Sequence, residues 1–176
     1  MLAGLTATLL AVSAATAAPA PRFNPAAPEN NQHLPSFNYG TVESVLTQVG
    51  ARFDRRGPAN RPALTVLFPN NRRAAILFGS CNPAGSICRS ISIQSVWNRP
   101  TGAPGERINQ LIAQFNQRYA FSRALVTRDG RIALQRYLTA DYGFVRGNLA
   151  VNLLVFANQA DRFSQEVVQP LTSPVR

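Results

Sequence analysis

Six apolar residues near the C-terminus repeat at the spacing of one face of an α-helix. They are Leu149, Leu153, Phe156, Ala160, Phe163 and Val167. The intervals of 4, 3, 4, 3 and 4 residues are typical of a helix with one buried side, and Asn148 is a suitable N-cap. Such a helix extends about 30 Å at 1.5 Å per residue. A helix of this length can cover a whole sheet face.

Two further helices are predicted by the same pattern. The first has Thr41 as its N-cap and ends at Gly50, with apolar residues at Val42, Val45, Leu46 and Val49. The second covers residues 106–119 and has one apolar side, formed by Ile108, Leu111, Ile112, Phe115 and Tyr119.

Five strands are predicted at residues 63–68, 74–78, 90–97, 123–128 and 131–140. Pro69-Asn70-Asn71 separates the first pair, and Asp129-Gly130 is a strong hairpin signal between the last pair. In the third strand Ile91, Ile93 and Ser95 share one face. The order α-β-β-β-α-β-β-α with short turns predicts an α+β fold with a five-stranded antiparallel sheet.

The N-terminal region is typical of an exported protein. Residues 1–18 contain a short apolar run and an Ala15-Thr16-Ala17 cleavage site, so we interpret them as a signal peptide. The Pro/Ala/Asn-rich residues 19–38 are predicted to be a linker, in which His33 is solvated. The folded domain is then residues 39–168, with a tail at 169–176. The expected location is periplasmic or secreted.

Composition excludes several kinds of enzyme. All 18 basic residues are Arg, giving a net charge of +10, so the Lys of a P-loop or of a Schiff-base enzyme is absent. One His and two Cys make a structural zinc site improbable. Asp129 and Asp141 are assigned to turns and are separated by a strand. We therefore predict no enzymatic activity, no catalytic residue, no cofactor and no metal.

Cys81 and Cys88 enclose six loop-like residues. In an exported protein a disulfide is the favoured interpretation, and closing this loop would stabilise the fold by about 2.5 kcal/mol. The alternatives are two buried thiols or a redox-active pair, although the spacing is not that of a CxxC motif.

Six arginines fall within 22 residues of the sequence. They are Arg52, Arg55, Arg56, Arg61, Arg72 and Arg73. They form either an ordinary solvated face or a binding surface. For an exported protein we expect an anionic lipid, a cell-wall polymer or an acidic polypeptide as the ligand, and no nucleic acid.

The stretch from Phe115 to Ala124, FNQRYAFSRA, resembles the "W-N-x-x-[YF]-x-[FY]-x-[KR]-[AV]" motif of the YbjN family. The Asp-Gly hairpin, a long strand and Gly147-Asn148-Leu149 come after it, as they do in that family. The family carries the label "putative bacterial sensory transduction regulator". Acidic positions common in its cytoplasmic members are Gln135, Arg136 and Tyr137 here.

The resemblance implies a fold like that of type III secretion chaperones, which are typically homodimers that bind extended polypeptide segments. It implies no reaction. We therefore predict a non-enzymatic binding domain, chaperone-like or regulatory, that engages a polypeptide partner. The alternative is an electrostatic binder of anionic envelope surfaces. A homodimer is expected, because sheet edges need to be blunted or paired. It would be held by a sheet edge or by apolar surface on the second helix, where Phe115 and Tyr119 are the candidate dimer or partner surface.

Overall fold

The computed structural model describes residues 23–172. Its main sheet is antiparallel and has six strands in the order β2-β3-β4-β5-β7-β6. Their bounds are β2 Arg52–Arg56, β3 Ala63–Leu67, β4 Arg73–Cys81, β5 Cys88–Trp97, β6 Arg123–Val126 and β7 Ile132–Thr139. The α+β class is confirmed. The predicted signal peptide, residues 1–18, lies outside the described residues.

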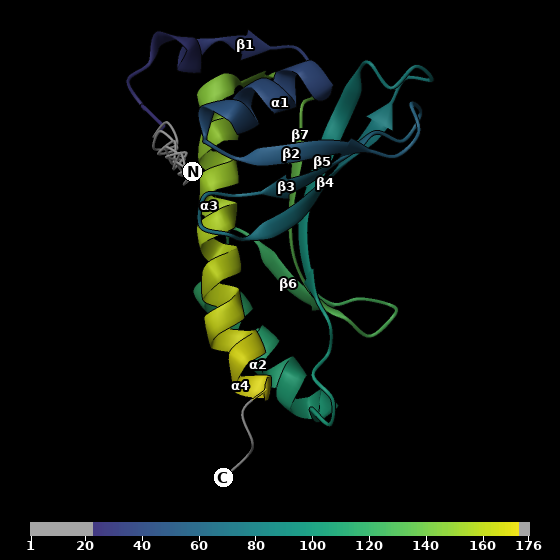
Figure 1. Cartoon of the computed structure of the whole chain (residues 1–176), viewed down its shortest axis with the longest axis vertical. Helices are drawn as coiled ribbons and strands as arrows, with labels where there is room; N and C mark the ends of the chain where they lie inside the picture. The colour runs from purple at the N-terminus through teal and green to yellow at the C-terminus, as the bar shows by residue number, and fades with distance from the viewer. Residues whose placement is uncertain (1–22, 173–176) are drawn as a thin grey trace, which may run out of the picture.

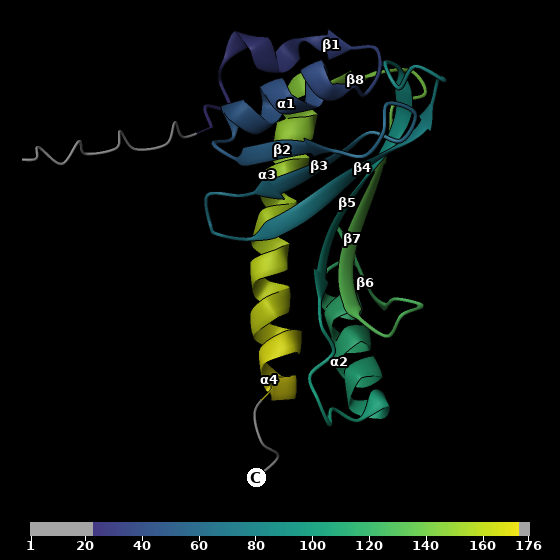
Figure 2. The ribbon, with the colours of Figure 1, turned by 45° about the vertical axis from the view of Figure 1, so that its right-hand side comes forward.

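Three long helices lie on one face of this sheet (Figures 1 and 2). They are α1 Tyr39–Gln48, α2 Gly105–Arg118 and α3 Arg146–Phe163. Helix α3 continues through a π-helical turn, η2 Ser164–Val168, into α4 Gln169–Thr172. Figure 1 shows α1 at one end of this long helix and α2 beside its other end.

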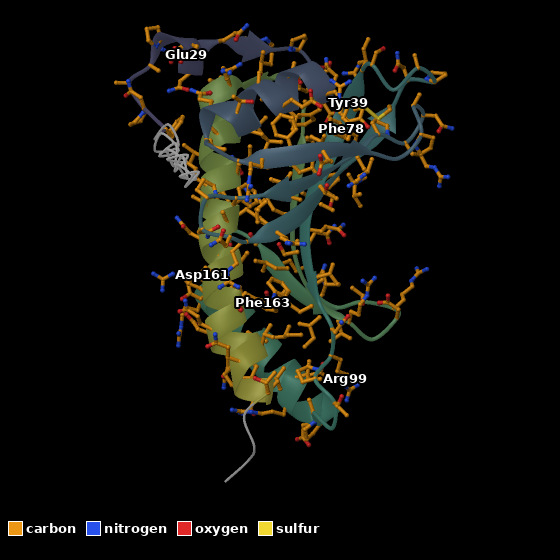
Figure 3. The ribbon with its side chains drawn as sticks, viewed as in Figure 1. Glu29, Tyr39, Phe78, Arg99, Asp161 and Phe163 are labelled. Carbon is orange, nitrogen blue, oxygen red and sulfur yellow. A yellow bond between two sulfur atoms is a disulfide. The ribbon has the colours of Figure 1, made fainter. Side chains whose placement is uncertain are left out.

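The core lies between the sheet and these helices. Every residue of the six-residue pattern that predicted the last helix is buried, and Leu153, Phe156 and Phe163 are fully so. The pattern Ile91, Ile93, Ser95 is buried on the same side, as predicted. Phe163 contacts Trp97 and Phe115, with ring centroids 5.0 and 4.9 Å apart, between α3, β5 and α2 (Figure 3).

The sheet has one strand more than predicted, because no sequence pattern indicated a strand at β2. Four of its five residues are charged and four are exposed, which is an unusual composition for a strand. It is formed by backbone pairing to β3, from Arg52 opposite Leu67 to Arg56 opposite Ala63. At the edge of the sheet the charged side chains can remain in water.

Two predicted helix caps were also wrong. Helix α1 has Asn38 as its N-cap, and Thr41 completes a capping box with it. Helix α3 begins at Arg146, because β8 Phe144–Val145 leads directly into it, and Val145 at the cap position makes no side-chain bond.

Much of the segment predicted to be a linker is folded onto the domain. It contains a short 3-10 helix, η1 Pro28–Asn31, and β1 His33–Leu34, which pairs with β8. Leu34 and Phe37 are buried, and Phe37 stacks on Phe144 at 4.4 Å. His33 itself is exposed, with Nε2 3.0 Å from the carbonyl oxygen of Tyr142. Apolar anchors, which a proline count does not reveal, hold this segment in place.

The predicted start of the C-terminal tail, at residue 169 of the tail 169–176, is likewise too early. Gln169–Thr172 is helical, and Leu171 is only 9% exposed.

The second face of the sheet, which we call the outer face, is covered by no described helix. Register places Arg56, Ala63, Leu77, Ser92 and Tyr137 side by side across it, from β2 to β7. Leu77 and Tyr137 are 41% and 58% exposed. This face is therefore accessible on both of these strands, β4 and β7.

Candidate functional site

Two of the six predicted arginines connect the sheet to the helices. Arg55 donates to both carboxylate oxygens of Glu43 on α1, at 2.6 and 2.8 Å, and its guanidinium lies 4.5 Å from the ring centre of Tyr39. The hydrogen bond with Glu43 raises the pKa of Arg55 above its usual value. Arg72 pairs with Asp161 of α3 at 2.7 Å. These two side chains are thus already engaged in the fold.

Three other arginines of the six converge on the outer face. Arg52, Arg56 and Arg73 line a hollow of about 570 Å³, whose lining also includes Thr65 and Leu67. Asp54 is the only acidic residue in the lining, and it lies 3.8 Å from Arg56. We define Arg52, Arg56, Arg73, Leu67 and Leu77 as the outer-face patch. It combines excess positive charge with exposed apolar surface.

The sixth arginine, Arg61, is exposed in the turn between β2 and β3. It does not line the hollow.

Cys81 and Cys88 form a disulfide between paired positions at the ends of β4 and β5. The predicted bridge is therefore confirmed. Cys88 also exchanges two backbone hydrogen bonds with Phe37, each 2.9 Å long. The bridge thus stabilises the corner at which the N-terminal segment joins the sheet.

Phe115 belongs to the core and not to a surface. It is 2% exposed and contacts Tyr119 as well as Phe163, so a partner could not reach it. Tyr119 is half-buried, and its hydroxyl donates to Glu166 at 2.7 Å. The exposed residues of α2 are Gly105, Glu106, Arg107, Asn109, Gln110, Ala113, Gln114, Gln117 and Arg118. None of these is a large apolar residue, so a dimer surface formed by α2 is not supported.

Asn116, next to Phe115 in the motif, closes one edge of the sheet. Its Oδ1 accepts from the backbone N–H of Ala124 at 2.8 Å, and its Nδ2 donates to the carbonyl of Ala124 at 3.0 Å. The side-chain amide thus takes the place that a neighbouring strand would occupy beside β6, which blunts that edge.

Arg136 is the functional candidate that sequence reasoning missed. It lies on the inner face, because its cross-strand neighbour Ile93 is buried there. It donates to Asn152 Oδ1 at 3.2 and 3.1 Å and to the carbonyl of Phe121, and it stacks 3.7 Å from the ring centre of Phe121. Burial lowers the pKa of its guanidinium below the usual value. The sequence did contain a signal for this residue, because Arg136 is a charged residue at an inward-facing position of a strand whose side chains alternate between the two faces.

The described residues do not bring the other polar candidates together. Asp129 bonds to Thr127 and Arg131 within its own hairpin, whereas Asp141 and His33 lie near β8. No group of three or more His, Cys, Asp or Glu side chains within residues 23–172 is placed to hold a metal ion. In the same range, no helix has both the length and the apolar character needed to cross a bilayer.

A family model described as "YbjN: Putative bacterial sensory transduction regulator" matches residues 38–169, three quarters of the chain. The chain belongs to the YbjN family. A comparison with curated proteins found no match. The YbjN match begins at Asn38, the N-cap of α1, and ends at the first residue of α4. The motif that resembles this family, from Phe115 to Ala124, covers the end of α2 and the start of β6 in this YbjN protein.

Proposed function

We propose that this YbjN-family protein is an exported, non-enzymatic binding domain that engages an acidic segment of a polypeptide through its outer face. The observation that carries the proposal is the outer-face patch, in which three arginines line a hollow together with the partly exposed Leu67. The exposed Leu77 lies in the same cross-strand row as one of these arginines, Arg56. Extended segments present alternating charged and apolar side chains, and such a segment complements this surface. The family's regulatory label is consistent with a binding role.

A polypeptide fits the patch better than a membrane does. The arginines line a hollow rather than a convex surface, and a flat anionic bilayer would contact the rim of a hollow and not its floor. Leu67 in the lining is only partly exposed, so a single inserted side chain can bury it while a lipid headgroup layer cannot.

Site-specific photocrosslinking in the native host tests the proposal. A crosslinking residue at Leu77 should yield one discrete protein adduct, whereas the same residue at Val151, 47% exposed on α3, should not. The double change Arg52→Gln and Arg73→Gln should lower the yield of this adduct about fivefold, since exposed ion pairs each contribute about 0.5 kcal/mol. The double change Arg107→Gln and Arg128→Gln, which removes the same two charges at exposed positions outside the patch, is the matched control.

The alternative is an electrostatic binder of anionic envelope surfaces. Salt-sensitive binding to anionic vesicles that is lost in the double variant of Arg52 and Arg73, with no protein adduct at Leu77, would replace the first proposal with this one.

Export is tested separately. The disulfide is compatible with an oxidising compartment, and we expect cleavage near Ala17 or Ala18. N-terminal sequencing of protein from the envelope fraction should find the new terminus there. Full-length protein in the cytoplasm would contradict both the signal peptide and the location.

A further inference from the structure

A second cavity lies toward the sheet edge opposite β2, where α2 ends and β6 begins. Its volume is about 410 Å³, and its lining includes Phe121, Ser122, Arg123, Arg136 and Tyr137. We call it the Arg136 cavity. Tyr137 also lies on the outer face, but none of these residues belongs to the outer-face patch, so a ligand of this cavity is a separate proposal.

The first observation is a half-buried cation without a counter-ion. Arg136 forms no ion pair within residues 23–172. Its hydrogen bonds go to a neutral carbonyl and a neutral amide oxygen. A guanidinium has five N–H donors, and these three bonds leave two. Phe121 stacks against the guanidinium plane, which fixes its orientation before a ligand arrives.

The second observation is a buried hydroxyl with no partner. Ser122 is 5% exposed, and its Oγ forms no hydrogen bond in the described structure. Buried polar groups of folded proteins nearly always have a partner, so such an exception needs an explanation. Ser122 follows Phe121, whose carbonyl accepts from Arg136. Ser122 lines the same cavity as Arg136, and its Oγ is buried as the side chain stands. A rotation about the Cα–Cβ bond would turn this unused donor toward a ligand in the cavity.

We infer that the Arg136 cavity binds the carboxylate of an organic acid. A monoanion compensates the single half-buried cation, while Arg123 at the exposed rim adds a second positive charge. A planar carboxylate accepts parallel N–H bonds from a guanidinium, and its charge makes the added O–H bond from a serine strong. Phe121 and Tyr137 provide aromatic walls for the organic part. The carboxylate can come from a small acid or from the C-terminus of a polypeptide.

Titration of the ¹⁵N-labelled protein, followed by NMR, tests this site with four probes. They are sodium benzoate, benzamide, and a phenylalanine-terminated tetrapeptide with either a free or an amidated C-terminus. We expect saturable shifts at residues 119–123 and 135–137 with the two carboxylates, and at least tenfold weaker binding of the two amides. Tighter binding of benzoate indicates a small acid, and tighter binding of the free peptide indicates a chain end.

Variants locate the binding in the cavity. Arg136→Gln removes the hydrogen bonds to Phe121 and Asn152 and can unfold the strand, so Ser122→Ala is the principal variant. It should weaken carboxylate binding about tenfold, the effect of losing a hydrogen bond to a charged group. Arg123→Gln should weaken it about threefold. Arg128→Gln, which has the same charge change outside the cavity, should bind as the wild type does.

The inference is overturned by equal binding of acid and amide, by Ser122→Ala binding benzoate like the wild type, or by no saturable shift up to about 10 mM benzoate at low salt. Saturation by sodium phosphate but not by either carboxylate would also overturn it, because the site would then serve a different class of anion.

Discussion

At the residue scale, two buried serines differ in whether their hydroxyl groups have a hydrogen-bond partner. Ser95 is 3% exposed and donates to the carbonyl of Arg73 at 2.6 Å, whereas Ser122 is 5% exposed and has no partner in the described structure. A buried hydroxyl without a partner loses its hydration and gains nothing in return. Ser95 is therefore a structural serine, whereas the fold gives the Ser122 hydroxyl no partner, and the proposed carboxylate would supply one.

We expect Ser122→Ala to raise the free energy of unfolding of the ligand-free protein by up to about 1 kcal/mol, because the uncompensated hydroxyl is removed. Ser95→Ala should lower it by about 1 kcal/mol, because the carbonyl of Arg73 loses a donor. Urea unfolding of both variants and the wild type measures the difference. A loss of stability in Ser122→Ala as large as in Ser95→Ala would show that Ser122 has a structural partner.

Asp129 gives a prediction about pH. A hydrogen bond from Thr127, and secondarily one from Arg131, lowers the pKa of the Asp129 carboxyl below its usual value. A group of this kind stabilises the fold above the unfolded pKa of about 3.9, and the contribution is lost as pH falls through the lower folded pKa. NMR titration should therefore give a midpoint below about 3.9 for Asp129.

Thr127→Val should return that midpoint toward its ordinary value, while Thr101→Val, at an exposed position in another loop, should leave it unchanged. An unaltered midpoint in Thr127→Val would exclude Thr127 as the cause.

At the scale of elements, α2 and β6 form one unit that the family motif connects. Phe115 fixes α2 in the core, Asn116 bonds to β6, and Phe121 supports Arg136. These contacts explain why motif residues with different chemistry occur together in one short stretch. The edge strand β6 has only four residues, so it depends on the side-chain amide.

We expect Asn116→Leu to lower the free energy of unfolding by about 2 kcal/mol, because the N–H and carbonyl of Ala124 both lose a partner. Asn109→Leu on the exposed side of α2 is the control and should change stability by no more than about 0.5 kcal/mol. Hydrogen exchange at Ala124 should also accelerate in Asn116→Leu alone. An unchanged exchange rate would mean that another group closes the edge.

The disulfide stabilises the β4–β5 corner by restricting the unfolded chain. The intact mass of unreduced protein should lie two hydrogens below that of the reduced protein, and reduction should lower the free energy of unfolding by about 2.5 kcal/mol. Iodoacetamide labelling of freshly isolated protein provides the check. Two alkylated thiols would contradict a bridge in the native compartment.

At the scale of the whole molecule, the two sheet edges differ. Asn116 covers β6, whereas β2 has a strand partner on one side only. Four of the five side chains of β2 are exposed, and Arg52, Arg55 and Arg56 outnumber Asp54. Copies that paired through β2 would bring like charges together, so salt should favour the pairing by screening them.

The homodimer therefore stays a prediction with a specific test. Light scattering of the mature protein at several concentrations should show a dimer, and the dimer should become tighter at high salt. Leu77→Ser, on β4 of the outer face, should leave a dimer formed by the β2 edges unchanged. A monomer at every concentration and salt would remove the dimer.

The sequence by itself determined the elements that have their own periodicity. The spacing from Leu149 to Val167, the alternation through Ile91 and Ile93, and the Asp-Gly hairpin predicted α3, β5 and the β6–β7 pair. Such patterns predict an element because a helix or strand with one buried face repeats its apolar residues at its own period. The disulfide also followed from sequence, since a short Cys spacing in a chain predicted to be exported favours it.

Only the tertiary structure decided the features that depend on distant partners. Strand β2 exists because β3 offers it backbone hydrogen bonds, and its own composition does not favour a strand. Phe115 is buried because Phe163, 48 positions later, packs against it. The same holds for Arg136: its contacts with Phe121 and Asn152 join three separate segments of the chain. No local pattern records such contacts, because their energies depend on which surfaces the completed fold brings together.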